Sequence, residues 1–151
     1  MGLHGFLGEI ILAEPLLYSD LTYKIIGLTM KVHQTLGNGF LEKVYENSLM
    51  ILLRRAGINA ERQVPIKVWF EGEIFGEYIA DILVEGKIIL ELKAVSEITN
   101  IHKAQVLNYL KATGLEIALI INFSGKSLEH FCLINRLNPS DDTKINTNWI
   151  K

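Results

Sequence analysis

Apolar residues recur at helical spacing in three stretches of the chain. Ser19 and Asp20 supply N-cap chemistry for a helix over residues 21–36. Its predicted buried stripe consists of Ile25, Ile26, Thr29, Val32, His33 and Leu36. "GNGF" at 37–40 ends this helix because Gly and Asn tolerate the left-handed conformation, and a second helix follows from about 41 to 56. A third stretch, 98–113, precedes Gly114, and its predicted buried positions are Ile101, Ala104, Val106, Leu107 and Leu110.

Strand-like patterns occupy the remaining stretches. Apolar residues alternate from residue 64 to residue 70, and Glu71-Gly72-Glu73 is a predicted hairpin turn. A strand through residue 84, a turn at 85–87 and a strand over 88–95 extend a mainly antiparallel sheet. "EIALIINF", 116–123, is typical of a strand covered on both faces, and 127–134 is a last strand. The helix between two strands implies a crossover connection, so the order predicts an α/β fold.

Length and composition fit one globular domain. The 151 residues divide into an appendage (1–19), a domain (20–136) and a polar tail (137–151). Hydrophobic residues make up 49% and charged residues 21%, which argues against global disorder. Glu9 and Glu14 interrupt an apolar N-terminus that lacks a basic region, so we expect no secretion signal. No apolar run approaches the ~20 residues of a membrane span, and we expect no membrane partner.

The charge balance and the cysteine count narrow the chemistry. Fifteen Lys and Arg face seventeen Asp and Glu, giving a net charge of −2, so nucleic-acid binding would need a local basic patch. Cys132 is the single cysteine, which excludes an internal disulfide and a cysteine-only metal site. A reducing compartment, the cytoplasm, is the expected location. Neither glycine-loop pattern for phosphate binding is present, so nucleotide binding has no support.

"ADILVEGKIILELKAV", 80–95, places three charged residues in an apolar hairpin. Glu91 and Lys93 lie two residues apart and therefore share one face of a strand. A three-residue loop at 85–87 would place Asp81 opposite Glu91, whereas a two-residue turn would put them on opposite faces. The turn sequence alone leaves both registers open.

Two carboxylates inside an apolar sheet repel each other and need a positive partner if both are ionised. Lys93 is one candidate partner, and a divalent cation such as Mg²⁺ is a better one because Mg²⁺ prefers oxygen ligands. Such a metal could activate water and stabilise charge on a phosphoryl group. The alternative is an internal salt bridge, or a solvated face of an edge hairpin, because D…E-x-K alone is a short pattern.

Linked motifs along the chain strengthen the metal-site interpretation. "GFLEKVYENSL" contains Gly39, Glu42 and Tyr45 in a G-x-x-E-x-x-Y spacing. Together with "VHQTLGNGFLE", "GEYIADILVEGKIILELKAV" and "QVLNYL", it closely resembles the GxxExxY protein family, which is assigned to the PD-(D/E)XK nuclease-like superfamily. The resemblance runs from about Leu21 to Arg136.

The resemblance implies a restriction-endonuclease-like core, a mixed β-sheet of about four core strands flanked by α-helices. It also implies a nuclease dependent on Mg²⁺ or Mn²⁺ that acts on DNA or RNA. Asp81 resembles the metal-binding aspartate, Glu91 the second carboxylate, Lys93 the active-site lysine, and Glu42 an additional acidic residue on the preceding helix. Ala80 replaces the proline of the superfamily motif, at a position that varies among related nucleases.

Further site residues follow from the RecB-like branch of these nucleases. Gln105 and Tyr109 lie four residues apart and hence on one helix face. Their spacing resembles that of branch residues that contact DNA or position the lysine. His33 is a candidate metal ligand by the same resemblance, although a histidine in a buried stripe is more often a core residue. Tyr45 is one turn beyond Glu42 and is expected to orient it.

A second function class stays open from sequence alone. A nuclease-fold module that binds nucleic acid or a partner protein without cleaving would agree with the acidic net charge. A local basic rim is available, and a homodimer would double it; its members are Arg54, Arg55, Lys87, Lys93, Lys103 and Lys111. A purely structural role would pair Asp81 with Glu91 away from Glu42 and Lys93.

Overall fold

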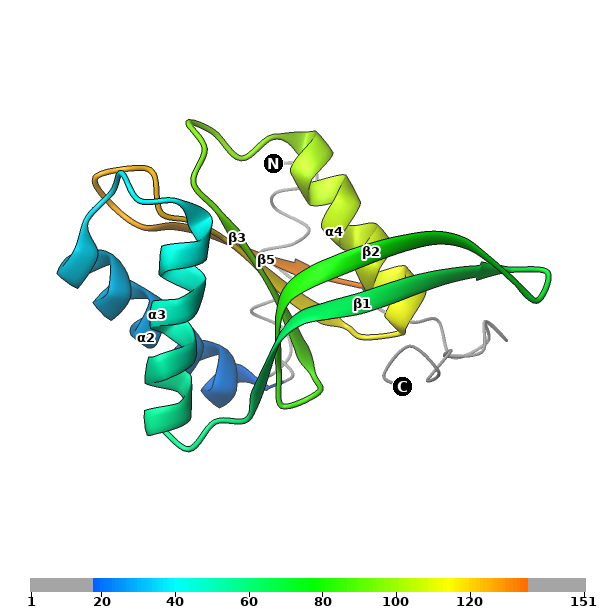
Figure 1. The fold of residues 1–151 in the computed structure, drawn as a ribbon, viewed down its shortest axis with the longest axis horizontal. Coiled ribbons are helices and arrows are strands. Elements are labelled where there is room, and N and C mark those ends of the chain that lie inside the picture. The colour runs from blue at the N-terminus through cyan, green and yellow to red at the C-terminus, as the bar shows by residue number, and fades with distance from the viewer. Residues whose placement is uncertain (1–17, 136–151) are drawn as a thin grey trace.

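The structure is a computed structural model that describes residues 18–135 (Figure 1). It has a five-stranded sheet with helices on both faces, which confirms the predicted α/β class and mixed sheet. The elements are α2 (Ser19–Leu36), α3 (Glu42–Arg55), β1 (Ala60–Phe70), β2 (Glu73–Val84), β3 (Ile88–Lys93), α4 (Asn100–Thr113), β4 (Ile117–Asn122) and β5 (Glu129–Ile134). The expected tail at 137–151, and the appendage up to residue 17, lie outside the described residues.

The strand order follows the chain, β1-β2-β3-β4-β5. Only β3 and β4 run parallel, and α4 makes the crossover between them, as the helix between two strands predicted. The other neighbours are antiparallel. The sheet therefore has one more strand than the core of about four that the family resemblance implied.

Two hydrophobic cores cover the two faces of the sheet. Helices α2 and α3 pack on one face, and α4 packs on the other. All six side chains of β4 are buried, so the prediction of a strand covered on both faces is confirmed. The strands near the middle of the sheet are consequently the most rigid support available for a functional site.

Two details of the helices differ from the sequence-based expectations. Tyr18 is the N-cap of α2, and no side chain caps that helix, so Ser19 and Asp20 lie inside its first turn. In α4, Val106, Tyr109, Leu110 and Thr113 are the buried residues. Ile101 is 79% exposed because it lies roughly 140° around the helix from Val106.

The β1–β2 hairpin extends beyond the rest of the sheet (Figure 1). Phe70 pairs with Glu73, so the connecting loop has two residues, Glu71 and Gly72, one fewer than predicted. Both have positive φ, 50° and 80°, as a tight hairpin turn requires. Strand β1 is an edge of the sheet and contains Pro65. Large apolar side chains near the tip are exposed, namely Trp69, Phe70, Ile74 and Phe75.

Candidate active site

The turn between β2 and β3 decides the register that the sequence left open. Val84 pairs with Ile88 and Ile82 pairs with Leu90, so the loop has three residues, 85–87. Continuing this register by one residue places Asp81 opposite Glu91. The two-residue turn, which would have put the two carboxylates on opposite faces, does not occur.

Strands β2 and β3 separate immediately beyond the Ile82–Leu90 pair. The two acidic side chains bond to the backbone groups that this separation leaves without strand partners. The N–H of Leu92 donates to Oδ2 of Asp81 at 2.8 Å, and the N–H of Asp81 donates to Oε1 of Glu91 at 3.2 Å. Asp81 and Glu91, hereafter the carboxylate pair, are therefore built into the fork of the sheet.

Burial and mutual repulsion favour the protonated forms of this pair. Glu91 is only 5% exposed, and its pKa rises to about 8, first because of burial and next because of the charge of Asp81. Burial also raises the pKa of Asp81, and Glu46 and Glu42 raise it further. A pair of this kind holds a proton near neutral pH unless a cation compensates both charges.

Lys93 ends β3 on the same face as Glu91. Its ammonium lowers the pKa of both carboxyl groups, so it lies close enough to act on them electrostatically. Between residues 18 and 135, however, the only ion pair within 4.0 Å joins Lys43 to Glu46. Lys93 is thus a neighbour of the carboxylate pair that is not held in a direct ion pair.

Helix α3 brings two acids toward the site. Glu42 is exposed in the first turn, and Glu46, one turn later, is only 4% exposed. The Nε2 of Gln63 donates to Oε1 of Glu46 at 2.6 Å, while Oε2 is buried without a hydrogen bond and lies 3.8 Å from Nζ of Lys43. Glu46 was not among the residues expected at the site, although its i, i+4 spacing from Glu42 places both acids on one face of the helix.

Tyr45 and His33 each stabilise a loop: Tyr45 bonds to the loop between α2 and α3, and His33 bonds to the loop between β4 and β5. The Tyr45 hydroxyl donates to the carbonyl of Gly37 at 2.7 Å and accepts from the N–H of Phe40 at 3.2 Å, and its ring stacks on Phe123 at 4.3 Å. Nε2 of His33 lies 2.9 Å from the carbonyl oxygen of Gly125 and donates to it. The Tyr45 hydroxyl therefore stabilises the loop and does not orient Glu42. Nε2 of His33 is engaged in its hydrogen bond and is not free to bind a metal.

Helix α4 places one predicted residue beside the carboxylate pair. Tyr109 is buried, and burial together with the charges of Glu91 and Asp81 raises the pKa of its hydroxyl to about 12. Its ring lies 5.3 Å from that of Tyr78, which adds to the shift. Gln105 is half-buried one turn earlier on the same helix face. The phenol of Tyr109 therefore remains a neutral hydrogen-bonding group at physiological pH.

The donor set fits a hard divalent cation with few protein ligands. Two adjacent carboxylates whose ionisation is opposed by burial would be stabilised by such a charge, and Mg²⁺ commonly uses only one or two carboxylates and keeps several waters. Within residues 18–135, no group of three or more His, Cys, Asp or Glu side chains is arranged to hold a metal ion. The structure thus assembles Asp81 with Glu91, and it does not bring Glu42 or His33 into one ligand group with them.

An open hollow lies at the start of α3, next to the end of β3. It has a volume of about 690 Å³, and its lining includes Phe40, Glu42, Lys43 and Ala94. Glu42 is the only candidate site residue in this lining, although Ala94 directly follows Lys93 in the chain. The described part of the chain contains no helix long and apolar enough to cross a membrane.

Comparisons with known proteins identify the family and support the fold. A sequence model described as the PD-(D/E)XK nuclease superfamily matches residues 19–133. No curated protein matches the chain. The crystal structure of SSO0001 is similar with a TM-score of 0.50 and 18% identity over 64% of this chain and 50% of that chain, so the similarity spans half of SSO0001 and supports the fold alone. The match to the family model covers most of the chain, and the chain therefore belongs to the PD-(D/E)XK nuclease superfamily.

Proposed function

We propose that this protein is a nuclease that hydrolyses phosphodiester bonds of nucleic acid, with DNA as the expected substrate and Mg²⁺ or Mn²⁺ as cofactor. The observation that supports it most is the carboxylate pair: a buried and a half-buried acid, both with raised pKa, fixed at a fork in the sheet beside Lys93. Perturbed acids of this kind cluster at functional sites. Membership of the superfamily supports the same reaction class.

Each residue has a distinct task in this proposal. Asp81 and Glu91 bind the cation, which when present supplies an activated water and stabilises charge on the phosphate. The Lys93 ammonium holds the attacking water and the phosphoryl oxygen near the pair. On α4, Gln105 donates to a phosphate oxygen, and Tyr109 borders the site. Glu42 contributes negative charge from the start of α3. The narrower GxxExxY assignment, in which Tyr45 supports the site indirectly through the loop, belongs to the same proposal.

The proposal is tested by cleavage of defined substrates. Wild-type protein is incubated with Mg²⁺ or Mn²⁺ and single-stranded, duplex or branched DNA and RNA. Lys93→Ala is expected to slow cleavage by about a hundredfold or more, whereas Lys24→Ala, an exposed lysine on α2, should leave it unchanged. Intact substrates in every wild-type reaction, with no metal binding by calorimetry, would reject the proposal.

A second candidate is a module of the same fold that binds nucleic acid or a partner protein without cleaving it. Both carboxylates already accept backbone N–H groups, and no third ligand joins them within the described residues, which favours this alternative. A homodimer would double the basic residues that such a module presents. Tight binding of DNA by wild type and Lys93→Ala alike, with no cleavage by either, would identify it.

A further inference from the structure

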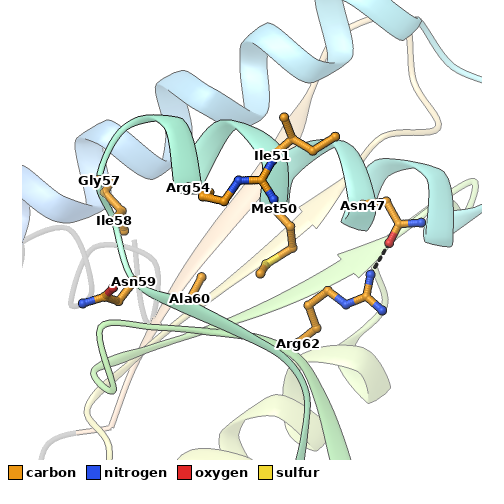
Figure 2. Close-up of a pocket in the computed structure, with 9 residues that line it drawn as sticks. All are labelled: Asn47, Met50, Ile51, Arg54, Gly57, Ile58, Asn59, Ala60 and Arg62. Atoms are coloured by element: carbon orange, nitrogen blue, oxygen red, sulfur yellow. Dashed lines mark hydrogen bonds between the residues drawn. The ribbon is translucent and has the colours of Figure 1, made fainter.

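A second hollow lies between α3 and the start of β1, with a volume of about 550 Å³ (Figure 2). Arg54 lines it from the helix and Arg62 from the strand, so positive charge stands on both walls. Met50 and Ile58, both half-buried, supply apolar lining between them. We call this feature the arginine hollow.

The two arginines are available to an anionic ligand. Both are exposed, and among the residues that the structure describes neither forms an ion pair. A hydrogen bond from Arg62 to the side-chain oxygen of Asn47 orients its guanidinium across the hollow (Figure 2). Guanidinium groups match phosphate oxygens with parallel N–H donors, and a fixed guanidinium loses less conformational freedom when it binds.

The arginine hollow and the candidate active site are related through the junction of α3 and β1. Two neighbouring side-chain contacts bridge α3 and β1: Asn47 with Arg62, and Glu46 with Gln63. The first contact borders the arginine hollow. The second contact lies beside the carboxylate pair, because the two residues that flank Gln63 on β1 pair with the two residues that flank Asp81 on β2. A chain passing along the α3–β1 junction would therefore meet the arginines and the carboxylate pair in succession.

We propose that the arginine hollow binds the phosphodiester backbone of the nucleic-acid substrate beside the cutting site, with Arg54 and Arg62 on phosphates of the backbone and the apolar lining against a sugar or base. This inference rests on the proposed function and adds a substrate subsite to it. It also explains how a chain with a net charge of −2 holds a polyanion, since the positive charge is concentrated where the backbone passes.

The test measures binding without cleavage. Labelled single-stranded and duplex DNA oligonucleotides are titrated with full-length protein in chelator, and anisotropy is followed at several salt concentrations. Arg54→Ala is expected to weaken binding about tenfold and to reduce the salt-dependence slope by about one. Lys24→Ala is the control: this exposed residue on α2 carries the same charge, but it does not line the arginine hollow. It should change affinity by less than about twofold.

Several outcomes overturn the inference. These are equal losses in Arg54→Ala and Lys24→Ala, an unchanged salt slope in Arg54→Ala, or a wild-type protein that binds neither oligonucleotide. A change from dimer to monomer in Arg54→Ala by light scattering, with unchanged DNA affinity, would assign the arginine hollow to a second copy of the chain instead. Thermal melting of both variants checks that they fold.

The result separates this inference from the proposed function. Arg54-dependent binding without metal-dependent cleavage would support the arginine hollow and reject the nuclease. Cleavage that requires Lys93 but is indifferent to Arg54 would support the nuclease and reject the arginine hollow.

Discussion

The carboxylate pair and the surroundings of Tyr45 lie near the same helix, α3, yet they differ in how their polar groups are satisfied. The Tyr45 hydroxyl both donates and accepts a hydrogen bond, and its ring stacks on Phe123. Asp81 and Glu91 each accept one backbone N–H while burial and repulsion oppose their ionisation. Both regions contain residues of sequence motifs: Tyr45 belongs to the G-x-x-E-x-x-Y spacing, and Asp81 and Glu91 belong to the D…E-x-K pattern.

This difference distinguishes a scaffold from a site. A buried polar group whose hydrogen bonds are complete stabilises one conformation and has little capacity to bind anything else. A buried pair of acids with too little compensating charge retains a strong affinity for a cation or a proton. Motif membership alone does not separate the two roles, whereas hydrogen bonding and electrostatics do.

The largest effect is expected from truncating Tyr45. Tyr45→Ala should lower the free energy of unfolding by about 4 kcal/mol, because it removes a fully buried aromatic ring. Tyr45→Phe keeps the ring and should cost about 1–2 kcal/mol, since the Gly37 carbonyl and the Phe40 N–H lose their partner. Urea denaturation measures both values. A Tyr45→Phe variant that keeps full stability but loses cleavage would show that Tyr45 acts in the active site and does not only stabilise the fold.

An intermediate effect is expected from pH. The folded-state pKa of Glu91 is about 8 against an ordinary 4.5, so the folded chain binds the extra proton between these values. Stability of the metal-free protein should therefore fall as pH rises through this window, with a slope of up to about 1.4 kcal/mol per pH unit for the one extra proton. Denaturation in chelator at a series of pH values measures the slope.

Glu91→Gln is the control for that slope. The variant cannot ionise at this position, so its stability should depend much less on pH over the same window. Added Mg²⁺ should flatten the wild-type profile as well, because a bound cation favours the ionised pair. An equal slope in wild type and Glu91→Gln would show that Glu91 does not have the raised pKa assigned to it.

The smallest effect on stability is expected at Glu42. Glu42→Ala removes an exposed acid from the first turn of α3 and should cost about 0.5 kcal/mol through the helix dipole. Cleavage assays then decide which region the residue belongs to. A large loss of activity in Glu42→Ala, with Glu46→Gln unaffected, would support Glu42 as a site residue; the opposite result would transfer that role to the buried acid one turn later.

Much of the fold was accessible from the sequence because local patterns agreed with the packing. Alternation and the apolar run over 116–123 identified the strands, and the helix between two strands implied the parallel pair β3–β4. The buried face of α4 was harder to predict. Ile101 and Ala104 are apolar but exposed, because they lie outside the face of α4 that packs on the sheet.

The site was less accessible than the fold. The sequence supplied Asp81, Glu91 and Lys93, but it left two hairpin registers open, and only the observed pairing of β2 with β3 distinguishes them. It did not identify Glu46, because the contact that orients this side chain comes from Gln63, seventeen residues away. It interpreted Tyr45 as support for Glu42, since the hydroxyl's bonds to a loop cannot be inferred from helical spacing.

Pro65 has a consequence for how this protein behaves in solution. It lies in β1, whose outer side has no neighbouring strand within the described sheet. Proline has no N–H to donate and is tolerated in edge strands where its ring nitrogen faces away from the sheet. A foreign strand aligning on β1 would find this donor missing midway along the edge. Pro65 therefore hinders aggregation by edge-to-edge strand pairing, which the exposed aromatic residues near the hairpin tip would otherwise favour.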